Sequence, residues 1–262
     1  MEYICEIKLY RLERKIRVGG VSYLNTKPLV YGLEKGLMQD QLDIVYDYPA
    51  AIARMLLADE IDVGLVPVAI IPRLKEAHLI SDYCIGAENE VASVCLFSEV
   101  PLPRVEKVML DYQSRTSVAL TQLLIRDYWK LNPEFLPTGS DYRKDIRGVT
   151  AGLVIGDRAL SQRRISPYIY DLASAWKDFT GLPFVFATWV SNKQLDEQFI
   201  QQFNEVNKYG LERIARVIES HPFADYDLHK YYGENISYGL TADKMKGLQT
   251  FLSMIGRLAM NP

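Results

Sequence analysis

The stretch Val18-Gly-Gly-Val-Ser-Tyr-Leu-Asn-Thr-Lys-Pro-Leu29 joins an expected strand to an expected helix. Residues 16–21 are largely β-branched and are broken by two glycines, which is typical of a buried strand that another backbone approaches closely. Pro28 fits the first turn of a helix capped by Asn25 or Thr26, because proline lacks only an amide that has no helical partner there. In an open α/β sheet, ligands bind beyond strand ends and against helix N-termini. Residues 22–26 are therefore a candidate ligand site, and an ordinary capped turn is the alternative.

Strands and helices alternate through the rest of the chain, which predicts an α/β fold with parallel sheet. The segment 131–147 is expected to be irregular, and the C-terminal quarter is expected to be helical. The expected strands are 43–46, 61–66, 91–98, 107–110, 151–155 and 184–190, and the expected helices begin at Pro28, Pro49 and near Ser117.

Two proline-marked crossings, at residues 99–104 and 180–190, predict two lobes. Lobe one would hold residues 16–98 and 190–262, and lobe two would be the inserted residues 99–189. Residues 1–15 precede the first strand as an N-terminal extension to which no role is assigned. A cleft between two lobes is a common ligand site that closes by hinge motion.

The composition indicates an ordinary globular protein. Of 262 residues, 48% are hydrophobic and 24% are charged, and the net charge of −3 does not predict a nucleic-acid partner. Three cysteines without metal-ligand spacing predict neither a disulfide framework nor a metal site. The N-terminus has no apolar signal-peptide core, and no apolar run is long enough to span a membrane, so a cytoplasmic location is expected.

A second polar stretch, Asp111-Tyr-Gln-Ser-Arg-Thr-Ser117, follows a strand and opens a helix. The hydroxyls of Ser114, Thr116 and Ser117, with Arg115 and the free amides of the first turn, would form a cradle for a carboxylate or phosphate. A well-capped helix with a solvated arginine has the same pattern.

These two stretches resemble the signature of the chorismate dehydratases of the futalosine route to menaquinone. Further matches are Ser93 in its strand, Gly156-Asp157 after a strand, residues 180–189, and Tyr231-Tyr232 with the later Ile-Ser-Tyr-Gly-Leu. The resemblance implies a two-lobed, periplasmic-binding-protein-like (type II) α/β fold with a ligand cleft between the lobes. It also implies that chorismate loses water to give 3-[(1-carboxyvinyl)oxy]benzoate, without a metal or other cofactor.

The resemblance implies catalytic positions at Asn25 and Ser93. The expected substrate-binding residues are Tyr23, Thr26, Ser114, Arg115, Thr116, Ser117 and Asp157. Neither Asn25 nor Ser93 is a base at neutral pH without an activating partner. Our hypothesis is that a substrate carboxylate takes the proton, while Asn25 and Ser93 fix its geometry and assist departure of water. Asp157 is the protein carboxylate that could act instead, and a capping role is its alternative.

No nucleotide-binding, metalloprotease or serine-hydrolase motif occurs, and the three histidines lie in no site motif. Three other readings stay open: a non-catalytic cytosolic protein that binds small carboxylates, the related 1,4-dihydroxy-6-naphthoate synthase, and a homologue that has lost activity. A shared fold does not decide among them.

Overall fold

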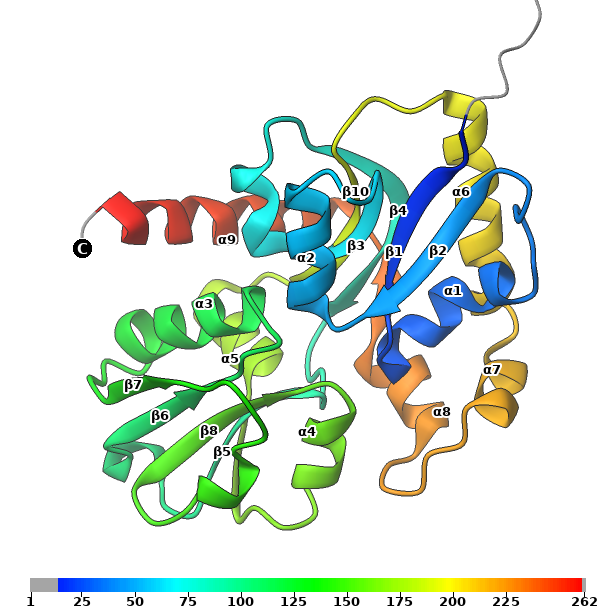
Figure 1. Ribbon diagram of the computed structural model, residues 1–262. Helices are drawn as coiled ribbons and strands as arrows, with labels where there is room; N and C mark the ends of the chain where they lie inside the picture. Colours follow the sequence, from blue (N-terminus) through cyan, green and yellow to red (C-terminus); the bar gives the residue numbers. More distant parts are fainter. Residues whose placement is uncertain (1–13, 261–262) are drawn as a thin grey trace, which may run out of the picture.

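Two β-sheets organise residues 14–260, the part of the chain that the computed structural model describes, with side chains described through residue 257 (Figure 1). Of the expected N-terminal extension, residues 1–13 lie outside the described residues, as does Cys5. Arg14, at its end, pairs with the buried carboxylate of Asp62 at 2.8 Å.

The first sheet has six strands in the order β11-β4-β10-β3-β1-β2. Its strands are β1 (Ile16–Val21), β2 (Leu42–Asp47), β3 (Val63–Pro67), β4 (His78–Ala87), β10 (Phe184–Ser191) and β11 (Ser237–Gly239). β1 runs parallel to β2 and β3, whereas β10 runs antiparallel to both β3 and β4. The sheet is therefore mixed, and the expectation of a parallel sheet is wrong for β10, which returns from the second lobe in the opposite direction, and for β11. It is also wrong for residues 94–98 of the second sheet, which pair antiparallel with both neighbouring strands.

The second sheet has five strands in the order β7-β6-β8-β5-β9. They are β5 (Val94–Ser98), β6 (Lys107–Leu110), β7 (Glu134–Pro137), β8 (Thr150–Ile155) and β9 (Tyr168–Asp171). β7 lies in the segment expected to be irregular. It is a short edge strand with no buried residue. Its sequence therefore lacks the alternation of apolar and polar residues by which a half-buried strand is predicted.

The predicted lobe boundaries need correction at both crossings. β5 pairs with β8 and β9, so residues 94–98 belong to the second lobe, and the first crossing is residues 88–93. β10 pairs with β3 and β4, so the second crossing is residues 181–183. The prolines at residues 101 and 103 lie at a turn within lobe two. Proline interrupts a strand equally well at a turn and at a lobe crossing, so the prolines alone did not distinguish the two.

Helices cover the faces of both sheets (Figure 1). They are α1 (Lys27–Glu34), α2 (Pro49–Leu57), α3 (Thr116–Leu123), α4 (Asp157–Gln162), α5 (Leu172–Thr180), α6 (Glu197–Leu211), α7 (Ile214–Ser220), α8 (Leu228–Lys230) and α9 (Ala242–Met260). α2 begins at its proline as expected, and α1 is followed by Gly36 with φ +83°, a conformation that glycine adopts without a Cβ clash.

An aromatic cluster joins the lobes beside the second crossing. Trp176 of α5, Phe184 of β10 and Phe251 of α9 are all buried, and their ring centroids are 5.0 to 6.0 Å apart in edge-to-face pairs. Edge-to-face rings are stabilising beyond the area they bury. The hinge is therefore backed by one continuous core that includes the C-terminal helix.

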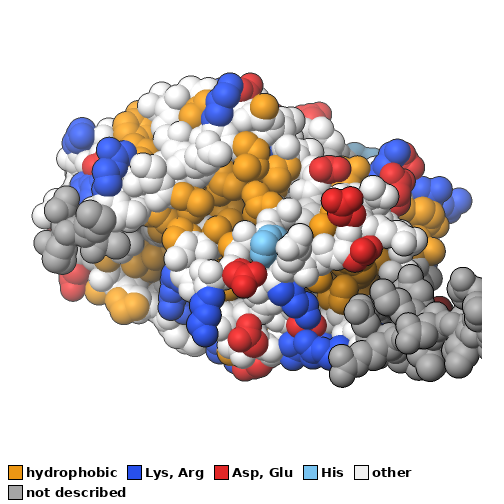
Figure 2. All heavy atoms as spheres, turned by 90° about the horizontal axis from the view of Figure 1, so that it is seen from above, with side chains coloured by type: hydrophobic (Ala, Val, Ile, Leu, Met, Phe, Trp, Pro, Cys, Tyr) orange, Lys and Arg blue, Asp and Glu red, His pale blue; other side chains and the backbone are white. Residues whose placement is uncertain are grey.

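The surface has charges of both signs. On the face shown in Figure 2, acidic and basic side chains are interspersed around a central hydrophobic area. No helix among residues 14–260 has both the length and the hydropathy to cross a bilayer.

Candidate active site

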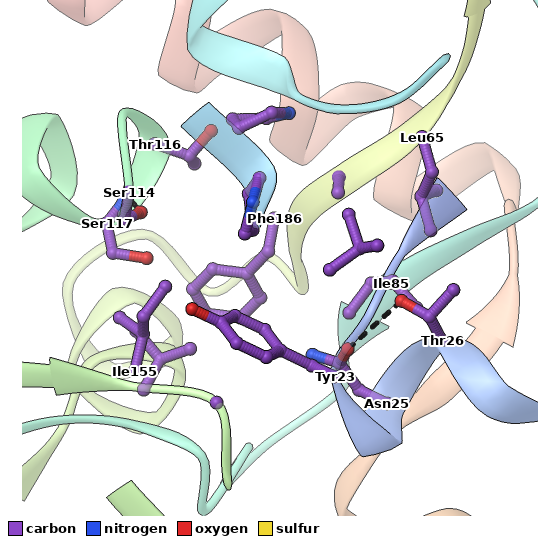
Figure 3. A pocket seen from close by; sticks show the side chains of 16 residues that line it. Tyr23, Asn25, Thr26, Leu65, Ile85, Ser114, Thr116, Ser117, Ile155 and Phe186 are labelled. Carbon is purple, nitrogen blue, oxygen red and sulfur yellow. Dashed lines mark hydrogen bonds between the residues drawn. The ribbon is translucent and has the colours of Figure 1, made fainter. Parts of the chain in front are cut away.

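A cavity lies between the two lobes, next to the strand-to-helix turn at residues 22–26 (Figure 3). It contains about 440 Å³ of space free of protein atoms, part of it open to solvent. Its wall is mostly apolar and comes from both sheets, including Leu65, Ile85, Ile155 and Phe186. Its polar groups are Tyr23, Asn25, Thr26, Ser114, Thr116 and Ser117, which are six of the nine predicted site residues.

Asn25 lies in the single 3₁₀ turn Leu24–Thr26 between β1 and α1. The Thr26 hydroxyl donates to Asn25 Oδ1 at 3.3 Å, and Tyr238 Oη donates to the Asn25 carbonyl at 2.9 Å. Tyr238 therefore anchors the backbone of Asn25, and Thr26 holds its carboxamide at the edge of the cavity (Figure 3). With Oδ1 engaged by Thr26, its NH2 group is the part that would donate to a ligand.

Tyr23 reaches from lobe one to lobe two. Its hydroxyl donates to Gln113 Oε1, and its ring lies on Gly156, where an added Cβ would be 2.8 Å from a ring carbon. Gly156 has φ +64° and ψ −148°, a backbone conformation that is essentially restricted to glycine. Gly156 thus gives Tyr23 the room to cross the cleft.

The helix start at residues 114–117 forms the opposite wall. Ser114 Oγ accepts a hydrogen bond from the Ser117 amide at 3.0 Å, and Thr116 Oγ1 accepts one from the Ala69 amide of lobe one at 3.1 Å. Figure 3 shows the three side chains gathered at one end of the cavity. The three hydroxyls expected at this wall line the cavity, and two of them also accept hydrogen bonds from backbone amides.

Arg115 does not take part in this cavity. Its side chain is exposed and lines a separate hollow with Arg54 and Arg73. In the first helical turn, neighbouring residues point in directions about 100° apart, so Arg115 faces away from the side that Ser114 and Ser117 share.

Ser93 lies behind the cavity wall. It is completely buried, its Oγ has no hydrogen-bond partner among the described residues, and its carbonyl accepts from the Gly156 amide at 2.8 Å. Its sequence neighbour Val94 and its backbone partner Gly156 both line the cavity. Ser93 is therefore next to the site, but its hydroxyl is not on the cavity surface.

A strained turn holds Ser93 at the first lobe crossing. The Ser93 amide donates to the Val91 carbonyl at 2.7 Å across Ala92, which has φ +62°. This is a γ-turn of the rare positive-φ form, which persists only where its surroundings fix it. The buried carboxylate of Asp171 fixes it by accepting from the amides of Val91 and Ala92.

Asp157 is the first residue of α4, beside Gly156, and does not line the cavity. Its Oδ1 accepts from the Leu24 amide of the other lobe at 3.0 Å. Burial raises the pKa of Asp157 to about 6, and the bond from Leu24 and the charges of Lys27 and Arg158 oppose that rise. The carboxyl thus bridges the lobes and titrates close to neutrality.

Residue-level reasoning on the sequence missed the group that anchors Gln113. Arg158 Nη2 donates to both carboxylate oxygens of Asp111, at 3.0 and 2.8 Å, and to Gln113 Oε1 at 2.6 Å. Asp111 is buried, so this ion pair fixes the loop that Tyr23 contacts. The only signal in the sequence is that Arg158 follows the Gly156-Asp157 pair at a strand end.

Neither a metal cluster nor a histidine belongs to this cavity. Within residues 14–260, no three His, Cys, Asp or Glu side chains are arranged to hold a metal ion. His78 and His221 lie near Glu76 and Glu34.

Known proteins are similar to this chain along nearly its whole length. A sequence model of the family described as menaquinone biosynthesis matches residues 16–257. A chorismate dehydratase of Thermus thermophilus is 27% identical over 268 residues, which cover 91% of this chain and 94% of the relative.

Solved structures share the fold. An Archaeoglobus fulgidus protein superposes with a TM-score of 0.75 at 13% identity, covering 94% of this chain and 98% of that one. A Candida albicans protein described as having the generic periplasmic binding protein fold has a TM-score of 0.61 at 10% identity, with 94% and 92% covered. The match to the family model extends through both lobes and both crossings, and so the chain belongs to the menaquinone biosynthesis family.

Proposed function

We propose that this protein is a cytoplasmic chorismate dehydratase, which acts in the futalosine route to menaquinone and gives 3-[(1-carboxyvinyl)oxy]benzoate. The observation that carries the proposal is the position of Asn25, with its amide at the edge of an apolar cavity whose far end holds three hydroxyls. Membership of the menaquinone biosynthesis family and the full-length similarity to a chorismate dehydratase support the same reaction.

The reaction suits a cavity of this kind. The substrate loses the ring hydroxyl and the proton on the carbon that bears the enolpyruvyl ether, so one water leaves and the ring becomes aromatic. Aromatisation supplies the driving force, so the protein has to bind, orient and exclude solvent rather than activate a strong nucleophile. Apolar side chains such as Ile155 and Phe186 would contact the ring, while the hydroxyls of Ser114 and Ser117 and the start of α3 would hold one carboxylate.

A substrate carboxylate would take the proton. Asp157 is the nearest alternative among the predicted residues, but it lies outside the cavity lining and its Oδ1 is engaged by Leu24. The Asn25 amide would donate to the substrate and keep its carboxylate aligned with the C–H bond. The Ser93 hydroxyl is shielded from the cavity, so it would assist departure of the ring hydroxyl only after a shift of the wall that Val94 and Gly156 form.

Incubation of the purified protein with chorismate, followed by mass spectrometry, tests the proposal through the loss of one water. We expect Asn25→Asp and Asn25→Ala to lower kcat/KM by about 100- to 1,000-fold, because one preorganised donor is lost. Asn204→Asp is the matched control, since Asn204 lies in α6, outside the cavity lining, and accepts hydrogen bonds only from Ser81 and Asp82 of lobe one.

Asn204→Asp should keep wild-type activity. Binding of chorismate without loss of water would favour a non-catalytic carboxylate-binding protein. Wild-type turnover by Asn25→Asp would show that the amide has no donor role.

A further inference from the structure

Lys244, in the first turn of α9, is the only lysine or arginine that is buried among the residues with described side chains. Its side chain is 0% exposed. Its ammonium group donates to the carbonyls of Ser237 and Gly239, both at 2.7 Å, and to Ser237 Oγ at 2.6 Å, so all three of its N–H groups are used. Its ion-pair partner, Glu88 Oε1, is 3.6 Å away and half exposed. The short bonds of this buried cation are therefore all to one strand, β11.

A buried ammonium needs an explanation other than packing. Taking a charged group out of water is costly, and an apolar side chain would fill the same space without that cost. β11 is an edge strand of three residues, and it pairs with β4 at two positions in an irregular register. Hydrogen bonds from a charged donor are roughly twice as strong as neutral ones. Lys244 therefore fixes a short strand to which the sheet itself supplies few bonds.

The residue between the two bonded carbonyls is Tyr238, which connects β11 to the candidate site. Its side chain is buried, and its hydroxyl donates to the carbonyl of Asn25 at 2.9 Å, across 213 positions of the chain. Asn25 lies in the short 3₁₀ turn Leu24–Thr26 at the cavity edge. A continuous path of hydrogen bonds thus runs from α9 through β11 to the backbone of Asn25.

We propose that Lys244 and Tyr238 are positioning residues for Asn25: the buried ammonium fixes β11, and the Tyr238 hydroxyl thereby sets where the Asn25 carboxamide stands at the cavity edge. This inference deepens the proposed function and rests on it. The reaction requires alignment of a donor rather than a strong base, and a misplacement of about 1 Å can lower a rate on the order of 100-fold. Neither Lys244 nor Tyr238 gains or loses a proton in this role.

Hydrogen exchange of backbone amides in the full-length protein measures the path without reference to activity. We expect Tyr238→Phe and Lys244→Met to speed exchange in the peptide that contains residues 22–27 about 10-fold, because each removes a bond that holds this turn in place. Lys246→Met is the matched control in the same helix, since Lys246 is exposed and bonds Asp243 at 2.9 Å. It should exchange at the wild-type rate in this peptide.

Chorismate dehydration gives the second readout. Tyr238→Phe and Lys244→Met should each lower kcat about 5- to 20-fold, the range of one hydrogen bond, with KM within about twofold. In an Asn25→Ala background, the same two changes should alter kcat by less than about twofold, because both residues act only through Asn25. A loss of stability alone would not depend on Asn25 in this way.

Wild-type exchange of residues 22–27 in Tyr238→Phe and Lys244→Met would overturn the inference, and so would equal losses of kcat with and without Asn25. The proposed function would stand in both cases. A Lys244→Met protein that does not fold would overturn the positioning role of Lys244, and Tyr238→Phe would then test the contact with Asn25 by the same two readouts. A wild-type protein that leaves chorismate unchanged, while exchange responds as expected, would overturn the proposed function and leave the path from β11 to Asn25 in place.

Discussion

At the scale of single residues, the site depends on side chains held by neighbours that do not themselves line the cavity. Tyr238 fixes the backbone of Asn25, Asp171 fixes the turn before Ser93, and Arg158 fixes Gln113. Such outer contacts determine how well a donor is aligned, and alignment is what a reaction without a strong base requires.

Asp157 gives a prediction about stability and pH. Its pKa is raised by burial to about 6, so between about pH 4 and 6 the folded protein binds more protons than the unfolded chain. The contribution of this group to stability is therefore greatest at low pH and is lost as pH rises through 6. We expect Asp157→Asn, which is uncharged and keeps an acceptor for Leu24, to raise the free energy of unfolding at pH 8 by roughly 1–3 kcal/mol.

The measurement is urea unfolding of both proteins between pH 4 and pH 8. The gain should fall to about 0.5 kcal/mol at pH 4, where Asp157 is protonated in the folded protein and about 40% protonated in the unfolded chain. A gain that is the same at every pH would mean that the charge of Asp157 is not the cause.

At the scale of elements, the C-terminal helix α9 secures the second crossing. It packs on β10 and also touches α3 of lobe two. A Cβ at Gly247 of this helix would be 2.1 Å from the Pro183 carbonyl oxygen, so only glycine lets the helix lie on the crossing. The close contact ties the hinge to a long helix rather than to a loop.

Gly247→Ala should therefore destabilise the protein by about 1–3 kcal/mol, since the helix or the crossing must shift. Gly256→Ala is the matched control in the same helix, because nothing lies within 4 Å of a Cβ there. That change should leave stability equal or raise it by about 0.5–1 kcal/mol through helix propensity. Chemical denaturation of the two variants checks both values, and equal effects would contradict the close-packing argument.

At the scale of the whole molecule, the lobes are closed on each other. Besides the Tyr23–Gln113 bond, the Leu24 amide donates to Asp157 at 3.0 Å, and the Ala50 amide donates to the Gln113 carbonyl at 3.1 Å. These bonds share residues with the candidate site. Binding and closure are therefore coupled, and any change that weakens closure reduces the population that binds substrate.

Tyr23→Phe removes one bond between the lobes and keeps the ring on Gly156. We expect a larger radius of gyration without ligand, and a KM raised about 3- to 10-fold with kcat little changed. Small-angle scattering and steady-state kinetics measure the two quantities. Tyr226→Phe is the control, because its hydroxyl bonds Asn235 within one segment. An unchanged radius and KM in Tyr23→Phe would show that this bond does not hold the lobes together.

The sequence by itself determined the features that depend on neighbouring residues. The strand–turn–helix at residues 16–34, the proline start of α2 and the hydroxyl-rich start of α3 all appear where local chemistry predicts them. Proline geometry and apolar periodicity act over a few residues, so they can be read directly from the chain. The cap expected from Asn25 or Thr26 is different, because neither side chain makes a capping hydrogen bond to α1. The resemblance of these stretches to a known family also predicted the two-lobed fold.

Tertiary structure alone decided which strands pair and which side chains meet. β5 and β10 joined the sheets opposite to those expected, Arg115 turned away from the cavity, and Ser93 lies behind the cavity wall. Sheet partners and side-chain directions at a cleft are set by contacts between segments far apart in the sequence, as Tyr23 with Gln113, 90 positions later, shows. The sequence pattern around either residue carries no information about that contact, because its energy exists only once both lobes have folded and closed.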